Sequence, residues 1–412
     1  MDEFRALMAA LGNPQNQFRS VLIAGTNGKG STASTLASIT DNSGVRTGLY
    51  TSPHLERVNE RIRIGVEEIG DEDFGRLFFC VYETAEGLVR EGDLPQLPSF
   101  FEILTAQAML YFAERKVGLA VLEVGMGGRL DATNVVEPLV SVITDISLDH
   151  TEWLGSTVAA ITREKAGILR RRGTLITLPQ DQGVNAVLGK IASELSVTVV
   201  KASGFVPRSD VPASGFYTVV GLGDRIEVQS PLSGVHQQRN VALAISASIE
   251  LAEAHGFPIS AASISEGIRK TYWPGRLERL HFGGVDWILD VAHNPAGAIA
   301  LRNGLNEFRG VGHPRILIFS CLLDKPLKEL ARILFPLFDE VIFAPIHSSR
   351  GMAMEELEAA GREMSVTTES AKSVGEALRR ARDRAMNGAV VISGSVYLVG
   401  EARPYLMGGG IE

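Results

Sequence analysis

The stretch AGTNGKGSTAS at residues 24–34 constrains the fold most, because it joins an apolar run to a helical pattern through three closely spaced glycines. VLIAG before it is typical of a buried strand, and STASTLASITDNSG after it is typical of a helix that ends near Gly44. A strand, a glycine-rich loop and a helix in this order gather backbone N–H groups and the positive helix end around one point. The sequence therefore predicts an oxyanion site, with a glycine turn that binds no ligand as the alternative.

The spelling of this loop departs from the usual phosphate loop, G-x-x-x-x-G-K-[ST]. Aligned on Gly28 and Lys29, the chain has Ile23 at the first glycine and Gly30 at the hydroxyl position, with Ser31 one place late. We expect Lys29 to reach the terminal phosphates of a nucleotide and Ser31 to add a hydroxyl. A lysine inside the glycine run favours a nucleotide site over a bare turn, but the loop alone does not distinguish a GTPase, a kinase and a ligase.

Further apolar runs alternate with helical stretches, and this pattern predicts an α/β fold with a mostly parallel sheet covered on both faces. These runs are TGLYTS, GLAVLEVG, VSVITDIS and GTLITL in the first half, and VDWILD, RILIFS, EVIFAP and AVVISGS in the second. Residues 199–228 are rich in Gly and Ser with alternating apolar positions, so we expect a small antiparallel piece or a domain flank there.

The length of 412 residues favours two domains over one core. Strand and helix patterns restart after the Trp-Pro-Gly run at 273–275, and proline and glycine tend to end regular elements. We predict a larger nucleotide-binding domain over residues 1–273 and a second, smaller α/β domain over residues 274–412.

Charge and cysteine content exclude several classes of protein. Forty basic and forty-eight acidic side chains give a net charge of −8, which disfavours a nucleic-acid partner. Only Cys80 and Cys321 occur, without metal-ligand spacing, so neither a disulfide framework nor a zinc site is expected. The first residues lack a basic segment followed by an apolar run, and no window approaches the roughly 18 apolar residues of a membrane helix. We therefore predict a cytoplasmic protein without a membrane partner.

Polar side chains follow several of the predicted strands at their carboxyl ends, the edge of a parallel sheet where ligands collect. Glu123 stands at the end of one apolar run, where a buried carboxylate requires a cation or a hydrogen-bond partner. A Mg²⁺ ion shared with nucleotide phosphates would meet that requirement. The alternative is a carboxylate paired with Arg129 or another basic group. Asp149 and His150 follow the next strand, which brings His150 to the same edge as Glu123 and the phosphate loop.

Two segments of the second half carry further candidates. LDVAHNP at 289–295 supplies Asp290, His293 and Asn294 at a strand end. PGRLE places Arg276 at the domain junction, where a guanidinium can stabilise phosphate charge from across a cleft. The alternative for Arg276 is a surface or hinge residue.

These stretches together resemble the folylpolyglutamate synthase and dihydrofolate synthase family, a branch of the muramyl ligase superfamily. Eleven blocks match in order, which is far more specific than one loop: LGNPQ, AGTNGKGS, TSPHLERVNERI, FFEILT, EVGMGGRLDATN, DISLDHTEWLG, REKAGI, HQQRN, PGRLE, LDVAHNP and SGSVYLVGEAR. Muramyl ligases usually keep the hydroxyl residue directly after the lysine, so GKGS favours the folate branch.

The resemblance implies a central P-loop ATPase domain, a C-terminal Rossmann-like domain, and an ATP- and Mg²⁺-dependent reaction in the cleft between them. ATP phosphorylates a substrate carboxylate, and the amino group of L-glutamate displaces phosphate from the acyl phosphate to form an amide. The expected acceptors are dihydropteroate and reduced folates, and the expected assembly is a monomer. A muramyl-type ligase and a P-loop kinase or GTPase are the alternatives, although a guanine-binding N-K-x-D sequence is not found.

Carried over by position, the resemblance also assigns site residues. The implied metal ligands are Ser52, Glu123 and His150, and the implied nucleotide contacts are Asn27, Gly28, Lys29, Gly30, Ser31, Asn240, Arg276 and Asp290. The implied substrate contacts are Phe101, Thr105, Leu130, Asp131, Ala132 and His293. Catalysis falls on Lys29, His150 and Lys165.

The helical pattern and the family resemblance give different predictions for Lys165. In its REKAGI block it has the pattern of an exposed helix lysine, whereas the family often carries a carbamate on this side chain. Family members also commonly carry a segment before LGNPQ that contributes pterin contacts in the forms acting on dihydropteroate. This chain begins ten residues before Leu11, so we expect polyglutamylation as the primary activity, with the dihydrofolate synthase activity beside it.

Overall fold

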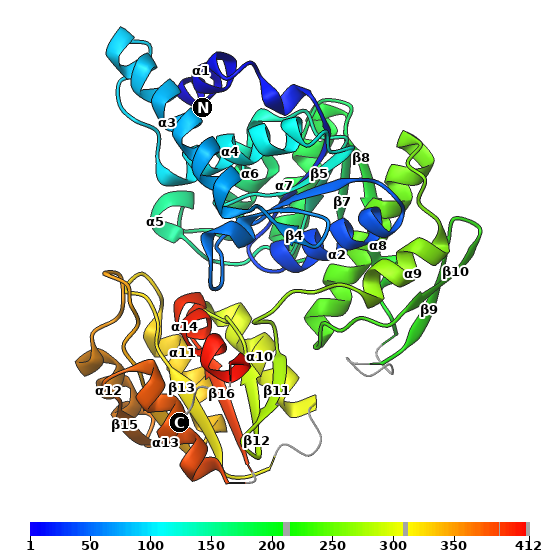
Figure 1. The fold of residues 1–412 in the computed structure, drawn as a ribbon. Coiled ribbons are helices and arrows are strands. Elements are labelled where there is room, and N and C mark those ends of the chain that lie inside the picture. Colours follow the sequence, from blue (N-terminus) through cyan, green and yellow to red (C-terminus); the bar gives the residue numbers. More distant parts are fainter. Residues whose placement is uncertain (209–214, 308–311, 387, 409–412) are drawn as a thin grey trace.

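The computed structural model describes residues 1–208, 215–307, 312–386 and 388–408. These residues form two α/β units, each built on its own large sheet (Figure 1). The first sheet is drawn in blue to green and the second in yellow to red. Both are mostly parallel, as the alternation of strands and helices predicts.

The first sheet has eight strands in the order β4-β3-β2-β5-β1-β6-β7-β8. Their bounds are β1 (Arg19–Ala24), β2 (Thr47–Tyr50), β3 (Ile62–Ile64), β4 (Glu67–Glu68), β5 (Leu119–Glu123), β6 (Val140–Ile143), β7 (Thr174–Thr177) and β8 (Thr198–Lys201). Strand β1 lies between β5 and β6, and five of its six residues are buried. The phosphate loop therefore leaves from the middle of the sheet. Among the described strands of this sheet, β3 pairs antiparallel with both β2 and β4.

Helices cover both faces of this sheet because successive residues of β1 point to opposite sides. Val21 and Ile23 pack into one core and Leu22 into the other. The first face is covered by α2 (Lys29–Asn42), α8 (Val235–His255) and α9 (Ala261–Arg269). The second is covered by α1 (Asp2–Ala10), α3 (Asp71–Glu91), α4 (Phe100–Glu114), α5 (Thr151–Leu154), α6 (Val158–Ala166) and α7 (Gln182–Leu195).

The irregular region expected at 199–228 contains the antiparallel piece. Strands β9 (Tyr217–Gly221) and β10 (Asp224–Val228) form a hairpin, with β10 against α9. Part of this region, residues 209–214, lies outside the described residues.

The second sheet has six strands in the order β11-β12-β16-β13-β14-β15, and β11 alone runs antiparallel to its neighbour. The strands are β11 (Glu278–Phe282), β12 (Val285–Leu289), β13 (Arg315–Phe319), β14 (Glu340–Phe343), β15 (Thr367–Ser370) and β16 (Ala389–Ser393). Helices α10 (Pro295–Glu307), α11 (Leu327–Leu334) and α12 (Met354–Glu363) lie on one face, and α13 (Val374–Ala385) and α14 (Val396–Met407) on the other.

Sequence patterns missed the short strands β3, β4 and β8 of the first sheet. They also missed the edge strands β11 and β15, because ERLHF and TTES are partly polar and lack an apolar run. The linker that contains Trp273 and Pro274 joins α9 to β11 of the second sheet. We propose the domain division at 273/274, within this linker. Among the helices of the described ranges, none is both long and apolar enough to cross a bilayer.

Candidate active site

A cavity of about 370 Å³ lies between the two sheets, at the carboxyl ends of β1, β2, β5, β6 and β12. Its size is within the range of small-molecule pockets. Among the predicted site residues, thirteen line it: Asn27, Gly28, Lys29, Gly30, Ser31, Ser52, Glu123, His150, Lys165, Asn240, Arg276, Asp290 and His293. The structure thus brings together residues from the first sheet, the linker and the second sheet in one space.

The phosphate loop ends at Gly28, which has a left-handed φ of 87° and caps α2. The first-turn N–H groups of a helix have no intrahelical partners, so α2 offers them to an anion. A side chain at Gly28 could not fit, because its Cβ would lie 2.1 Å from Oδ1 of Asn240. Lys29 donates from Nζ to the carbonyl of Thr26 at 3.2 Å, which folds it back over the loop.

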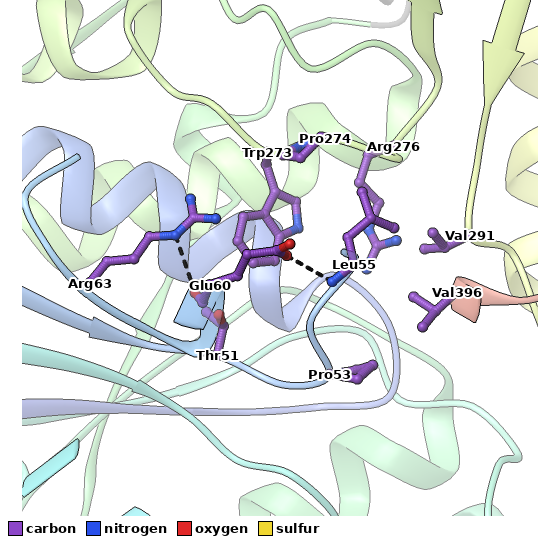
Figure 2. A pocket seen from close by; sticks show the side chains of 10 residues that line it. All are labelled: Thr51, Pro53, Leu55, Glu60, Arg63, Trp273, Pro274, Arg276, Val291 and Val396. Carbon is purple, nitrogen blue, oxygen red and sulfur yellow. Dashed lines mark hydrogen bonds between the residues drawn. The ribbon is translucent and has the colours of Figure 1, made fainter. Parts of the chain in front are cut away.

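The glycine after the lysine is explained by the linker. A Cβ on Gly30 would lie 2.6 Å from Cζ2 of Trp273, whose indole occupies the space that a serine or threonine side chain would need. Figure 2 shows the indole between Arg63 and Arg276, and the Arg63 guanidinium lies 5.9 Å from the ring centroid. The hydroxyl residue of the loop is therefore displaced to Ser31, which is buried and lines the cavity.

Glu123 is a buried carboxylate at the end of β5, which pairs with the strand that leads into the phosphate loop. Its Oε2 accepts a hydrogen bond from the backbone N–H of Ser52 at 3.2 Å. Burial raises the pKa of Glu123 above its usual value, although Lys29 and Arg276 nearby lower it. The alternative pairing with Arg129 is wrong, since Arg129 donates to Glu164 at 3.1 Å.

The donors around Glu123 suit a hard cation that also binds phosphate. Glu123, the Ser52 hydroxyl and His150 line the same cavity as the phosphate loop. In the described part of the chain, no three His, Cys, Asp or Glu side chains form a ready-made metal site. Mg²⁺ does not need one, because it binds through one or two protein groups together with substrate phosphates and water. The residues present therefore fit Mg²⁺ bound together with a nucleotide.

Lys165 is buried rather than exposed, which overturns the expectation from its helical pattern. Helix α6 delivers its Nζ to the phosphate loop, where it donates to the carbonyl of Gly25 at 2.7 Å. Burial, together with the nearby charge of Lys29, lowers the pKa of Lys165 to about 7. Near neutral pH, a large share of this amine is therefore uncharged.

Asp149 lies at the centre of a polar network that crosses the cavity from one sheet to the other. It accepts from Lys325 Nζ at 3.1 Å and from Asn294 Nδ2 at 3.0 Å, and its Oδ2 lies 3.9 Å from His293 Nε2. Asn294 also donates to Oδ1 of Asn27 at 3.0 Å. The Lys325 ammonium beside Asp149 holds the pKa of its carboxyl well below the usual range despite burial.

Lys325 is a site residue that sequence reasoning missed. It is buried and follows β13, in the segment CLLDKP. A lysine and an aspartate shortly after an apolar run are the same kind of signal that identified Asp290 and His293. The lysine and Asp149 are far apart in sequence, so nothing local indicated their pairing.

Asp290 and Arg276 connect the linker to β12. The carboxylate of Asp290 accepts from the backbone N–H groups of Leu277 and Ala292, each at 2.9 Å. Arg276 lies in the cavity wall, so the surface alternative is wrong, whereas its place in the linker agrees with a hinge position. His293 is held by a 2.8 Å contact between Nδ1 and the carbonyl of Val291. Burial lowers the pKa of His293 to about 4.

The predicted pterin contacts lie beside this cavity and do not line it. Phe101 packs on Gly125, where a Cβ would come within 2.6 Å of its ring, and Thr105 is buried against Tyr50 Oη at 3.0 Å. Asp131 is buried and accepts from the N–H of Met126 at 3.0 Å. Ala132 is buried next to it, and Leu130 is exposed. These residues shape the loop at 125–127, and their contact with a substrate stays a prediction.

Comparison with known proteins gives family matches over both sheets. Residues 23–248 match the Mur ligase middle domain, and residues 275–396 match the Mur ligase glutamate ligase domain. The folylpolyglutamate synthase of Lacticaseibacillus casei is 35% identical over 98% of this chain and 93% of its own length. The dihydrofolate synthase/folylpolyglutamate synthase of Bacillus subtilis is 32% identical, with 98% and 94% covered.

Solved structures are similar over nearly the whole chain. The Mycobacterium tuberculosis folylpolyglutamate synthase complexed with ADP and AMPPCP superposes with a TM-score of 0.90 at 33% identity, covering 98% of this chain and 94% of that one. The E. coli FolC in complex with DHPP and ADP has a TM-score of 0.86 at 29% identity, with 99% and 93% covered.

The packing of Trp273 on the phosphate loop leads to a first prediction. Gly30→Ser restores the usual hydroxyl position but forces a Cβ into the indole, and such overpacking costs about 1–3 kcal/mol. We expect the melting temperature to fall by roughly 2–10 °C and nucleotide affinity to weaken. Thermal unfolding and nucleotide titration measure both. Gly87→Ser on α3, where a Cβ would meet nothing within 4 Å, is the control. A Gly30→Ser protein that melts like the wild type would contradict the packing argument.

Proposed function

The chain belongs to the folylpolyglutamate synthase and dihydrofolate synthase family of Mur ligases, and from this premise we propose that it joins L-glutamate to reduced folates and to dihydropteroate. The family resemblance predicted from the eleven sequence blocks is confirmed, and the protein is an ATP-dependent ligase. The acceptor, the Mg²⁺ ion and the roles of individual residues are our proposals.

One observation carries the proposal. The phosphate loop and the buried Glu123 line one wall of the cavity, and Arg276 and His293 line the other. Phosphoryl transfer needs positive groups around the moving phosphate, and amide formation needs a second substrate held next to it. A cavity with these two walls can hold a nucleotide and the substrate that supplies the amino group side by side. All of its walls come from one chain, so we propose a monomer as the functional unit.

The side chains divide the reaction between them. The loop amides at 27–31 and Lys29 hold the terminal phosphates, and Arg276 adds positive charge from the linker. A carboxylate oxygen of the folate attacks the terminal phosphorus, ADP leaves, and an acyl phosphate forms. The amino group of L-glutamate then attacks the carbonyl carbon, and phosphate leaves as the amide forms. His293, near Lys325, is placed to bind the incoming amino acid.

We propose Mg²⁺ as the metal, held by Glu123, Ser52 and His150. When bound, it neutralises phosphate charge during transfer. The ion would stabilise the buried Glu123 most, because a buried carboxylate without a cation is costly in free energy. His150 suits a neutral ligand, since burial lowers the pKa of its imidazole.

We also propose that Lys165 carries a carbamate in the active protein. The uncharged amine attacks carbon dioxide, loses one proton and becomes an N-linked carboxylate. The change places an anion near the Lys29 ammonium, which is favourable electrostatically. The 2.7 Å hydrogen bond to Gly25 is compatible with it, because the carbamate nitrogen keeps one N–H.

The activity is tested with purified protein, ATP and Mg²⁺ by following phosphate release as acceptor and amino acid are varied. We expect release to require both L-glutamate and a pteroate or folate acceptor. Comparing dihydropteroate with tetrahydrofolate decides which of the two activities is present. Release that is independent of L-glutamate, or that responds to a muramyl precursor, would exclude the proposal.

The metal assignment predicts that Glu123→Ala abolishes turnover without unfolding the protein, because the fold does not need this charge. A loss of at least 100-fold in kcat is expected, of the order seen when one electrostatic group is removed from a site. Arg129→Ala, which breaks an exposed ion pair with Glu164, is the matched control. Turnover of Glu123→Ala that persists at low Mg²⁺ would remove Glu123 from the metal site.

The carbamate predicts a pH dependence with a definite sign. Because the pKa of Lys165 is lowered to about 7, the amine is mostly protonated below that pH and cannot react with carbon dioxide. We expect native mass spectrometry in bicarbonate to show one added carbon dioxide at pH 8 and less of it at pH 6. Activity should fall over the same interval. Lys165→Arg, which cannot form the adduct, is the control, and an adduct on this variant would locate the modification elsewhere.

A further inference from the structure

The last matching block, SGSVYLVGEAR, contributes nothing to the cavity, yet its arginine is buried. Arg403 lies on α14 in the second domain, with a side chain only 9% exposed. A buried guanidinium needs several acceptors, and Arg403 has them. Those acceptors come from three separate segments of the chain.

The guanidinium of Arg403 joins the two domains and the linker. Nη1 donates to Glu56 Oε1 at 2.6 Å, in the loop that follows β2 of the first sheet. Nη2 donates to Tyr272 Oη in the linker at 2.7 Å, and Nε donates to Glu278 Oε2 on β11 at 3.0 Å. The planar fork of arginine suits such a junction better than the single charge of lysine.

The segment that Arg403 contacts is a tightly held loop. Glu60 accepts from the backbone N–H groups of Leu55, Glu56 and Arg57, each at 2.7 Å. Figure 2 shows the bond from Leu55 to Glu60 beside Trp273 and Arg276. The same loop begins at Ser52, whose N–H binds Glu123. Three residues, 53–55, therefore separate Glu56 from Ser52 of the proposed metal site.

The tip of this loop docks on the second domain. Leu55 packs against the core formed by α13, α14 and the second sheet. Its carbonyl approaches Gly400 so closely that a Cβ there would lie 1.9 Å away. The loop thus belongs to the first sheet by connection and to the second domain by packing.

We propose that Arg403 is a positioning residue for the ligation, which holds the loop carrying Ser52 against the linker and α14. It thereby keeps the wall with the phosphate loop and Glu123 in register with the wall with Arg276 and His293. Arg403 does not line the cavity, so the proposed role acts through the loop and the linker that it contacts. The inference rests on the proposed ligase function, because register between the walls matters only if both substrates react across them.

The test uses the full chain with Arg403→Met, Arg403→Lys and Glu56→Gln. Misplacement by about 1 Å costs on the order of 10²-fold in rate, so we expect kcat to fall by about 10- to 100-fold in Arg403→Met and Glu56→Gln. ATP affinity should fall less than kcat, because the phosphate loop and Lys29 lie within the first domain, whereas Arg276 lies in the linker that Arg403 contacts through Tyr272. Arg403→Lys should recover part of kcat. Glu56→Gln removes the charge that pairs with Arg403 across the domains, leaves the bonds of Arg403 to Tyr272 and Glu278 in place, and covers the case in which Arg403→Met does not fold.

Arg380→Met is the matched control. Arg380 pairs with Glu369 and Glu376, all within the second domain, so its loss removes a similar ion pair without touching the loop. Wild-type kcat in Arg403→Met and Glu56→Gln, or an equal loss in Arg380→Met, would overturn the inference.

A second readout does not depend on activity. Small-angle X-ray scattering should show a larger radius of gyration for Arg403→Met and Glu56→Gln than for the wild type and Arg380→Met. If the wild type forms no amide, the proposed function fails while this comparison still reports on the joint. An unchanged radius of gyration in both joint variants would overturn the positioning role.

Discussion

Buried charges between the two sheets are the constraint on which the rest of this structure depends. Asp149 and Lys325 come from different sheets and meet at 3.1 Å with both side chains almost fully shielded from water. Removing one partner of such a pair leaves an uncompensated buried charge, at a cost of about 3–5 kcal/mol. This pair therefore favours the arrangement of the two sheets in which Asp149 and Lys325 meet. The same shielding makes each charge in the cavity effective on a bound phosphate.

Charge compensation in the cavity is uneven, and the unevenness marks the ligand positions. Asp149 and Asp290 are surrounded by donors from the chain itself. Glu123 receives one backbone hydrogen bond from Ser52 and keeps a raised pKa. Lys165 lies on the loop carbonyl of Gly25 with a lowered pKa. A cation at Glu123 and an added carboxylate on Lys165 would both relieve this imbalance. The proposals for Mg²⁺ and carbamate therefore support each other.

Much of the fold was predictable because buried parallel strands are written as continuous apolar runs. The central strands β1, β5 and β6 and the helix after the phosphate loop were expected, and the hairpin near 199–228 agrees with one of the two alternatives for that region, a small antiparallel piece. The polar edge strands β11 and β15 were missed, since half-exposed strands carry little apolar signal. The site followed the same division. Glu123, His150, Asp290 and His293 could be found because each follows an apolar run, whereas Lys165 was misjudged from its helical context.

The sequence by itself determined the local chemistry: a glycine loop before a helix, polar groups at strand ends, and a set of blocks specific enough to identify the family. It could do so because these features depend on residues close together in the chain. Only the tertiary structure decided why Gly30 carries no side chain, which partner Asp149 finds, and what Arg403 holds. Each of these depends on contacts between segments more than a hundred residues apart, where backbone and side chains compete for the same small volume, and no local pattern encodes that competition.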